Sequence, residues 1–119
     1  MKEIKHVFEP NPLACGQAVV AMLTGTDVFE IIKLAGTDRE TTLADMRRLL
    51  SGFGFRLADN RSQAFSVSDL PEIALLSLET PKCWHWSLYV LGRIYDPEHG
   101  VLDGFPESDR KYFWEIKES

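Results

Sequence analysis

Cys15 is the residue of this sequence whose position most favours nucleophilic chemistry. It stands just before residues 18–23, an uncharged run of small and apolar side chains that predicts a helix buried on most sides. A thiol at the N-terminus of a buried helix lies at the positive end of the helix macrodipole, which favours thiolate over thiol. Free cysteines are also common core residues, so Cys15 needs partners elsewhere in the chain before it indicates catalysis.

Two polar residues in the second half of the chain are the expected partners. Residues 86–95 predict a β-hairpin, and a two-residue loop at 91–92 makes Ser87 face Asp96 across the two strands. His85, two residues before Ser87, then points to the same side of the sheet as Asp96. Such a diagonal pair lies roughly 7–8 Å apart between backbones, within reach of a carboxylate and an imidazole N–H. A three-residue loop would place the two side chains on opposite faces.

Together these residues predict the chemistry of a thiol hydrolase. A thiolate attacks a carbonyl, an imidazole protonates the leaving group, and a third polar group fixes the imidazole tautomer. A metal site built from Cys83, His85, Asp96 and His99 is the weaker alternative, because Cys-x-His on a strand lacks the ligand pairing of known zinc sites. We therefore expect no metal and no cofactor.

Composition narrows the class of protein. The chain has 119 residues, of which 45% are hydrophobic, so we expect one domain over residues 1–119. The formal net charge is −5 and no Lys/Arg cluster is present, which disfavours a nucleic-acid partner. The apolar runs are too short to span a bilayer, and the charged N-terminus is not followed by a signal-like segment. The expected location is cytoplasmic, with reduced thiols; the oligomeric state stays open.

Local patterns predict helices in the first half of the chain. Three short helices are each bounded by a capping residue and a glycine, at residues 11–25, 27–36 and 42–52. In the first of them, Asn11 is the expected N-cap and Pro12 the expected first helical residue.

The second half of the chain changes to the pattern of strands. Residues 1–9 could enter as a lead-in strand or an extended arm, and the strands themselves are predicted at 53–57, 64–67, 73–78, 86–91, 93–95 and 112–116. Helices followed by an antiparallel sheet indicate an α+β domain.

The motifs together resemble the bacterial peptidase C39-like branch of papain-like cysteine proteases. The resemblance runs over residues 8–100 and rests on Ala14-Cys15-Gly16-Gln17-Ala18, on His85-Trp86 in a late strand, and on Tyr95-Asp96-Pro97 at the end of the next strand. It implies a papain-like fold in which the cysteine helix of the N-terminal half packs on a C-terminal antiparallel sheet. It also implies that Cys15 is the nucleophile, His85 the base and Asp96 the residue that orients the imidazole.

The sequence differs from the family pattern at the residue that donates a hydrogen bond to the oxyanion. The family usually carries a glutamine six residues before the cysteine, and this position is Glu9 here. An ionised carboxylate accepts hydrogen bonds and repels an oxyanion, so Asn11 is the alternative donor. The predicted function is a cysteine peptidase-like hydrolase that acts on a peptide or amide bond through Cys15, His85 and Asp96. The alternative is a weak or inactive domain of the same fold that binds a peptide or protein partner.

Overall fold

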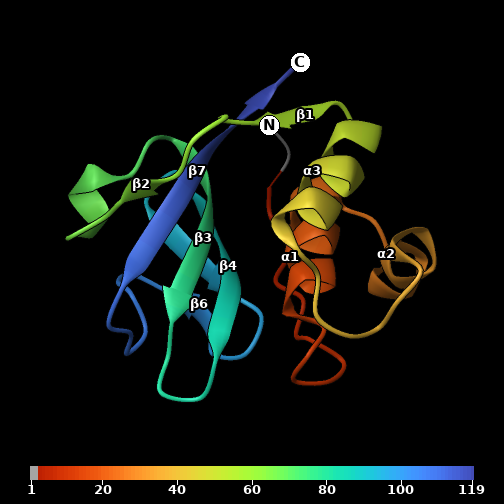
Figure 1. Ribbon diagram of the computed structural model, residues 1–119, viewed down its shortest axis with the longest axis horizontal. Helices are drawn as coiled ribbons and strands as arrows, with labels where there is room; N and C mark the ends of the chain where they lie inside the picture. The colour runs from red at the N-terminus through yellow and green to blue at the C-terminus, as the bar shows by residue number, and fades with distance from the viewer. Residues whose placement is uncertain (1–2) are drawn as a thin grey trace.

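The computed structural model describes residues 3–119, so Met1 and Lys2 of the predicted N-terminal arm lie outside the described residues. In the described part, helices lie on one side of the molecule and an antiparallel sheet on the other (Figure 1). The α-helices are α1 (Cys15–Thr24), α2 (Val28–Ala35) and α3 (Leu43–Gly52), and a short 3-10 helix is η1 (Val67–Asp69). The strands are β1 (Phe55–Leu57), β2 (Ser62–Gln63), β3 (Ile73–Glu79), β4 (Trp84–Val90), β5 (Arg93–Asp96), β6 (Gly100–Leu102) and β7 (Lys111–Glu118).

The first helix begins later than the capping pattern predicts, and this matters for the site. Asn11 does not cap α1: its Oδ1 accepts the Leu13 N–H at 2.8 Å and its backbone oxygen accepts the Ala14 N–H at 3.1 Å. These bonds form a separate turn before the helix, so the prediction of Pro12 as the first helical residue is wrong. Cys15 is instead the first residue of α1, where backbone N–H groups have no partner within the helix.

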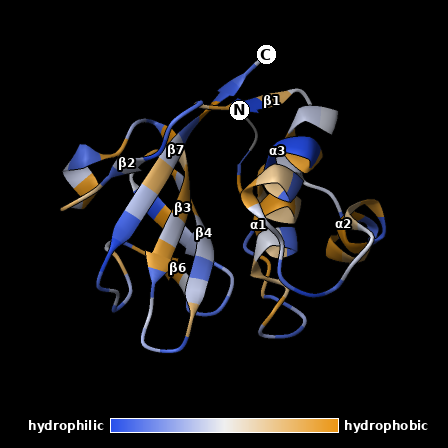
Figure 2. Cartoon of the chain, in the orientation of Figure 1, coloured by the Kyte–Doolittle hydropathy of each residue, from blue (hydrophilic) through white to orange (hydrophobic). Residues whose placement is uncertain are grey.

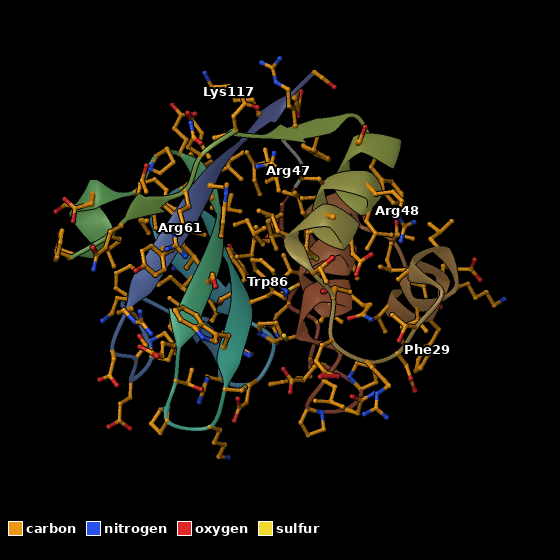
Figure 3. All side chains as sticks on the ribbon, in the orientation of Figure 1. Phe29, Arg47, Arg48, Arg61, Trp86 and Lys117 are labelled. Carbon is orange, nitrogen blue, oxygen red and sulfur yellow. The ribbon has the colours of Figure 1, made fainter. Side chains whose placement is uncertain are left out.

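The other two helices begin where their caps predict. Asp27 accepts the Phe29 N–H at the start of α2. Thr42 and Asp45 form a reciprocal capping box at the start of α3, with bonds of 3.1 and 2.9 Å. Farther along α3, the Arg47 guanidinium donates to backbone oxygens beyond β1 (Figure 3), which ties this helix to the sheet.

The sheet confirms the hairpin register on which the predicted site depends. The strand order is β1-β7-β3-β4-β5-β6, with β2 paired to β7. Val90 pairs with Arg93, so the β4–β5 loop has two residues as predicted. Leu91 and Gly92 have φ of 46° and 98°, the left-handed pair that a type I′ turn needs. This turn matches the twist of the flanking strands and fixes which side chains share a face.

One predicted strand is wrong. Residues 64–67 are not a strand, because the chain pairs with β7 only at β2 and then turns into η1. The Asp69 carboxylate accepts the backbone N–H groups of Phe65 and Ser66 at 2.8 and 3.0 Å. This cap gives those N–H groups a local partner in place of a neighbouring strand. Strand β6, which pairs with β5, was not predicted at all.

The principal core lies between α1 and the sheet. Nine of the ten residues of α1, Cys15 to Leu23, are buried, as the uncharged run predicts. Hydrophobic residues predominate along β3 at the centre of the sheet (Figure 2), and Leu75 of β3 and Leu88 of β4 meet α1 there. A second cluster on β3, β4 and β5 is covered by partly buried hydrophobic residues of η1, β6, β7 and the loops. In the part of the chain that is described, no helix has the length and apolar character needed to cross a membrane.

Candidate active site

Asp96 has a fully buried carboxylate that accepts hydrogen bonds from β4 and from the turn after β5. Its Oδ1 accepts from His85 Nε2 at 3.1 Å and from the backbone N–H groups of Glu98 and His99 at 2.9 and 3.0 Å. Its Oδ2 accepts from the Ser87 hydroxyl at 3.0 Å. Burial by itself would raise the pKa of Asp96, but His85 and the backbone donors outweigh it and hold that pKa well below the ordinary value. Asp96 is therefore an anion at neutral pH.

His85 is held between Asp96 and Cys15. The ring is 2% exposed, and its Nε2 faces Asp96, which leaves Nδ1 for the Cys15 thiol. Burial opposes the charged imidazole, yet the hydrogen bonds with Asp96 and Cys15 more than offset it and raise the pKa of His85 well above its ordinary value. The structure thus brings together the three residues that the sequence predicts, with a protonated imidazole between the Asp96 carboxylate and the Cys15 sulfur.

Trp86 connects Cys15 to the sheet and to the loop before α3. Its backbone N–H donates to Cys15 Sγ at 3.4 Å, and its indole N–H donates to the Thr41 carbonyl at 2.9 Å. Figure 3 shows Trp86 between the strands and the helices, where its ring lies against Trp114. Trp86 therefore helps to fix the position of the sulfur, a role that the sequence alone does not indicate.

Gly16 and Gln17 hold the loop 37–41 against the first turn of α1. The Gln17 amide donates to the backbone oxygens of Thr37 and Arg39, both at 2.9 Å. A side chain at Gly16 would collide with the Thr41 hydroxyl and come within 3.1 Å of the Trp86 ring. Only glycine fits here, so the Cys-Gly pair of the sequence motif has a packing reason.

A pocket of about 350 Å³ opens beside the cysteine. Its wall combines apolar rings with few polar groups, and consists of Pro12, Leu13, Cys15, Glu40, Thr41, Ser77, Cys83, Trp84, His85 and Trp86. A larger hollow of about 620 Å³ lies between the N-terminal arm and the far end of α1, away from Cys15. The smaller pocket is the one that places Cys15 and His85 within reach of a ligand.

The two oxyanion candidates lie outside the residues that line this pocket. Asn11 is engaged in loop structure: its Nδ2 donates to the Asp38 carbonyl at 3.0 Å and its Oδ1 accepts from Leu13. Glu9 is half-buried, and its Oε1 is enclosed without a hydrogen-bond partner in the described structure. The structure therefore favours a structural role for Asn11, and it leaves Glu9 as an unpaired acceptor.

Two further histidines contact Asp96: His99, which the sequence suggests only as a ligand of the alternative metal site, and His6, to which it assigns no role. His6 Nε2 lies 2.6 Å from the backbone oxygen of Asp96, and His99 Nδ1 lies 3.0 Å from Asp96 Oδ1. All three histidines of the chain thus contact Asp96. The spacing Asp96-Pro97-Glu98-His99 is typical of an Asx-type turn and was the available signal for His99. Nothing local in the sequence points to His6.

The residues of the alternative metal site are not gathered into one cluster. Cys83 is exposed in the β3–β4 loop, where its N–H donates to Thr80, whereas His85 and His99 contact Asp96. Within residues 3–119, no group of three or more His, Cys, Asp or Glu side chains is arranged to hold a metal ion.

The fold is similar to a solved peptidase domain. One match is the crystal structure of the peptidase domain of Streptococcus ComA, a bi-functional ABC transporter involved in a quorum sensing pathway. It has a TM-score of 0.66 and 15% sequence identity, and it covers 98% of this chain and 100% of that one. The chain has a C39-like peptidase fold. No protein-family model and no curated protein matches the sequence. At this identity the likeness establishes the architecture alone.

The charge pair of Asp96 and His85 predicts a pH-dependent stability. The lowered pKa of Asp96 contributes stability that is present above the ordinary carboxyl value and is lost as pH falls through the folded value. The raised pKa of His85 contributes stability that is complete below about pH 6.5 and is lost as pH rises through its raised value. Asp96→Asn should therefore cost about 3–5 kcal/mol near pH 5.5, and less at about pH 9. Urea unfolding at both pH values measures this, and an equal loss at both would contradict it.

The close packing at Gly16 predicts that Gly→Ala lowers the stability of the protein here, the opposite of its usual effect in a helix. Gly→Ala inside a helix ordinarily stabilises by about 0.5–1 kcal/mol. Gly16→Ala should instead destabilise by about 1–3 kcal/mol, because the new methyl group displaces Thr41 and the Trp86 ring. Gly52→Ala in α3, where the added methyl group meets open space, is the matched control. Thermal unfolding of both variants tests the packing; a Gly16→Ala protein as stable as the control would refute it.

Proposed function

We propose that this domain is a thiol hydrolase of the cysteine peptidase type that acts on peptide or amide bonds. The observation that carries the proposal is the placement of one buried imidazole between the Asp96 carboxylate and the Cys15 thiol, at the wall of a pocket. In this proposal Cys15 is the nucleophile, His85 the general acid and base, and Asp96 the residue that orients the ring. The similarity of the fold to a peptidase domain supports the same reading.

The acylation half-reaction follows from the contacts of His85. The Cys15 sulfur attacks the substrate carbonyl carbon, a C–S bond forms, and the carbonyl oxygen becomes an oxyanion. The His85 imidazolium then gives its Nδ1 proton to the leaving nitrogen, and the C–N bond breaks. An amine departs and a thioester remains on Cys15. Asp96 keeps the ring oriented because its Oδ1 holds Nε2 throughout.

Deacylation uses the same groups in reverse. His85 Nδ1 takes a proton from a water molecule as the water oxygen attacks the thioester carbonyl. The C–S bond then breaks and a carboxylic acid leaves, while His85 keeps the proton that it took from water and is again an imidazolium beside the sulfur. The buried Asp96 carboxylate stabilises the imidazolium in both halves of the reaction.

The start of α1 is suited to negative charge at the reacting carbonyl. Cys15 is the first residue of the helix, and the N–H groups of the first turn have no helical partner. The positive end of the helix macrodipole adds a favourable field. In the proposal the backbone N–H of Cys15 is one oxyanion donor. Trp84 and Trp86 supply an apolar wall that fits an extended peptide, the proposed class of partner.

A second candidate function is a peptide-binding domain with weak or no turnover. The observation that favours it is the enclosed, unpaired oxygen of Glu9, whose charge interacts with His85. An ionised carboxylate there opposes the negative charge of the acylation step. Binding would use the same pocket in both cases, so only a covalent intermediate separates the two functions.

Trapping of an acyl-enzyme tests the proposed hydrolase. The protein is mixed with the p-nitrophenyl ester of an N-acetylated dipeptide, quenched in acid, and mapped by peptide mass spectrometry. We expect a burst of nitrophenol and an acyl group on Cys15. His85→Ala should slow the burst by about 10²–10⁴-fold, because the general acid and base is lost.

Cys15→Ser and the second thiol of the chain provide the controls. Cys15→Ser should give no thioester, while Cys83, an exposed thiol in the same molecule, reports the reactivity of an ordinary cysteine. Labelling of Cys83 in preference to Cys15, or a burst that His85→Ala leaves unchanged, would overturn the proposed function. Peptide binding without acylation would favour the second candidate.

A further inference from the structure

Glu9 is fixed beside the turn that carries Asp96. It belongs to the extended arm before α1, and its backbone N–H donates to the Pro97 carbonyl at 2.9 Å. This bond holds the backbone of Glu9 against the residue that follows Asp96, and the Glu9 and Asp96 carboxylates are close enough for their charges to interact. The side-chain Oε1 of Glu9 is enclosed and has no hydrogen-bond partner in the described structure. An acceptor enclosed without a donor is costly when it carries charge, and uptake of a proton relieves that cost.

The groups that face Glu9 come from β4, β5 and the following turn. Two imidazoles, His85 and His99, attract its carboxylate, whereas two carboxylates, Asp96 and Glu98, repel it. Burial is the largest influence and raises the pKa of Glu9, and the two acidic neighbours add to it, while the two histidines oppose it in part. The net direction is upward, so Glu9 takes up a proton at higher pH than an ordinary glutamate.

The position of Glu9 lets its charge act on the proposed reaction. Its charge interacts with the ring of His85, which lines the pocket together with Cys15. Attack by the sulfur creates negative charge on the substrate carbonyl, and a nearby carboxylate opposes that charge. A protonated carboxyl group does not oppose it, and it presents an O–H donor.

We propose that Glu9 is a proton-controlled switch for the thiol chemistry of Cys15: the site reacts when the Glu9 carboxyl is protonated and is held back when it is ionised. This inference rests on the proposed function, because it concerns the acylation of Cys15. It goes beyond that function by making acidity the regulator of the reaction.

The switch also has a signature that needs no substrate. A carboxyl whose folded pKa is raised contributes stability that is present below its ordinary value and is lost as pH rises through the folded value. Glu9→Gln keeps the shape of the side chain and removes the charge. The melting temperature of Glu9→Gln should therefore equal that of the wild type at about pH 4 and exceed it by a few degrees at about pH 7.

The decisive experiment compares the rate of Cys15 acylation by the nitrophenyl ester in wild type, Glu9→Gln and a control across about pH 4 to 8. The control is Glu107→Gln, an exposed residue of the loop between β6 and β7. The acylation rate of Glu9→Gln divided by that of the wild type should be near one at the acidic end and rise to about 100-fold at the neutral end. This factor is the size of the effect of losing one oxyanion donor. Glu107→Gln should follow the wild type throughout.

The outcomes separate the inference from the function on which it rests. Acylation of Cys15 with a Glu9→Gln to wild-type ratio that does not change with pH overturns the switch and leaves the hydrolase standing. A melting-temperature difference that is constant with pH also overturns the switch, because Glu9 then takes up no proton in this range. Folded proteins that acylate Cys15 in no variant at any pH overturn the proposed function, and the switch with it.

Discussion

The buried contact between Asp96 and His85 is the interaction on which the rest of the site depends. The carboxylate accepts hydrogen bonds from β4 and from its own turn, and the N-terminal arm binds its backbone oxygen through His6. These contacts outweigh the cost of burying a charge, which is why the pKa of Asp96 falls although burial alone would raise it. Asp96 thereby joins three separate parts of the chain, through its carboxylate and its backbone oxygen, and its carboxylate orients the His85 ring.

The helical half supplies the sulfur, and its position is set by close packing more than by charge. Gly16 lets loop 37–41 lie directly on the first turn of α1, and the Trp86 indole N–H donates a hydrogen bond to the Thr41 carbonyl of the same loop. The Trp86 backbone also donates to Cys15 Sγ, so one residue of β4 joins sheet, sulfur and loop. A site that depends on contacts of this kind tolerates little change in side-chain volume.

The parts of this structure that the sequence predicts are those set by local rules. Burial of α1 follows from its uncharged run, and the two-residue loop at 91–92 fixes the face shared by His85 and Asp96. The predicted start of α1 is wrong because Asn11 accepts hydrogen bonds within a separate turn before the helix. The contact of His6 and the surroundings of Glu9 could not be predicted from the sequence. Both depend on contacts between the N-terminal arm and a turn some 90 residues away, and no periodic pattern in the sequence indicates such contacts.

The protonation state of His85 tests the central claim most directly. In protein labelled with ¹⁵N-histidine, the nitrogen chemical shifts of His85 report whether one or both ring nitrogens carry a proton. Because Asp96 and Cys15 hold the proton on this ring, both nitrogens should stay at imidazolium shifts from about pH 5 to about pH 8, while Asp96→Asn should restore a titration within that range. A wild-type His85 that titrates near pH 6.5 like a free histidine, or one that Asp96→Asn leaves unchanged, would contradict the account.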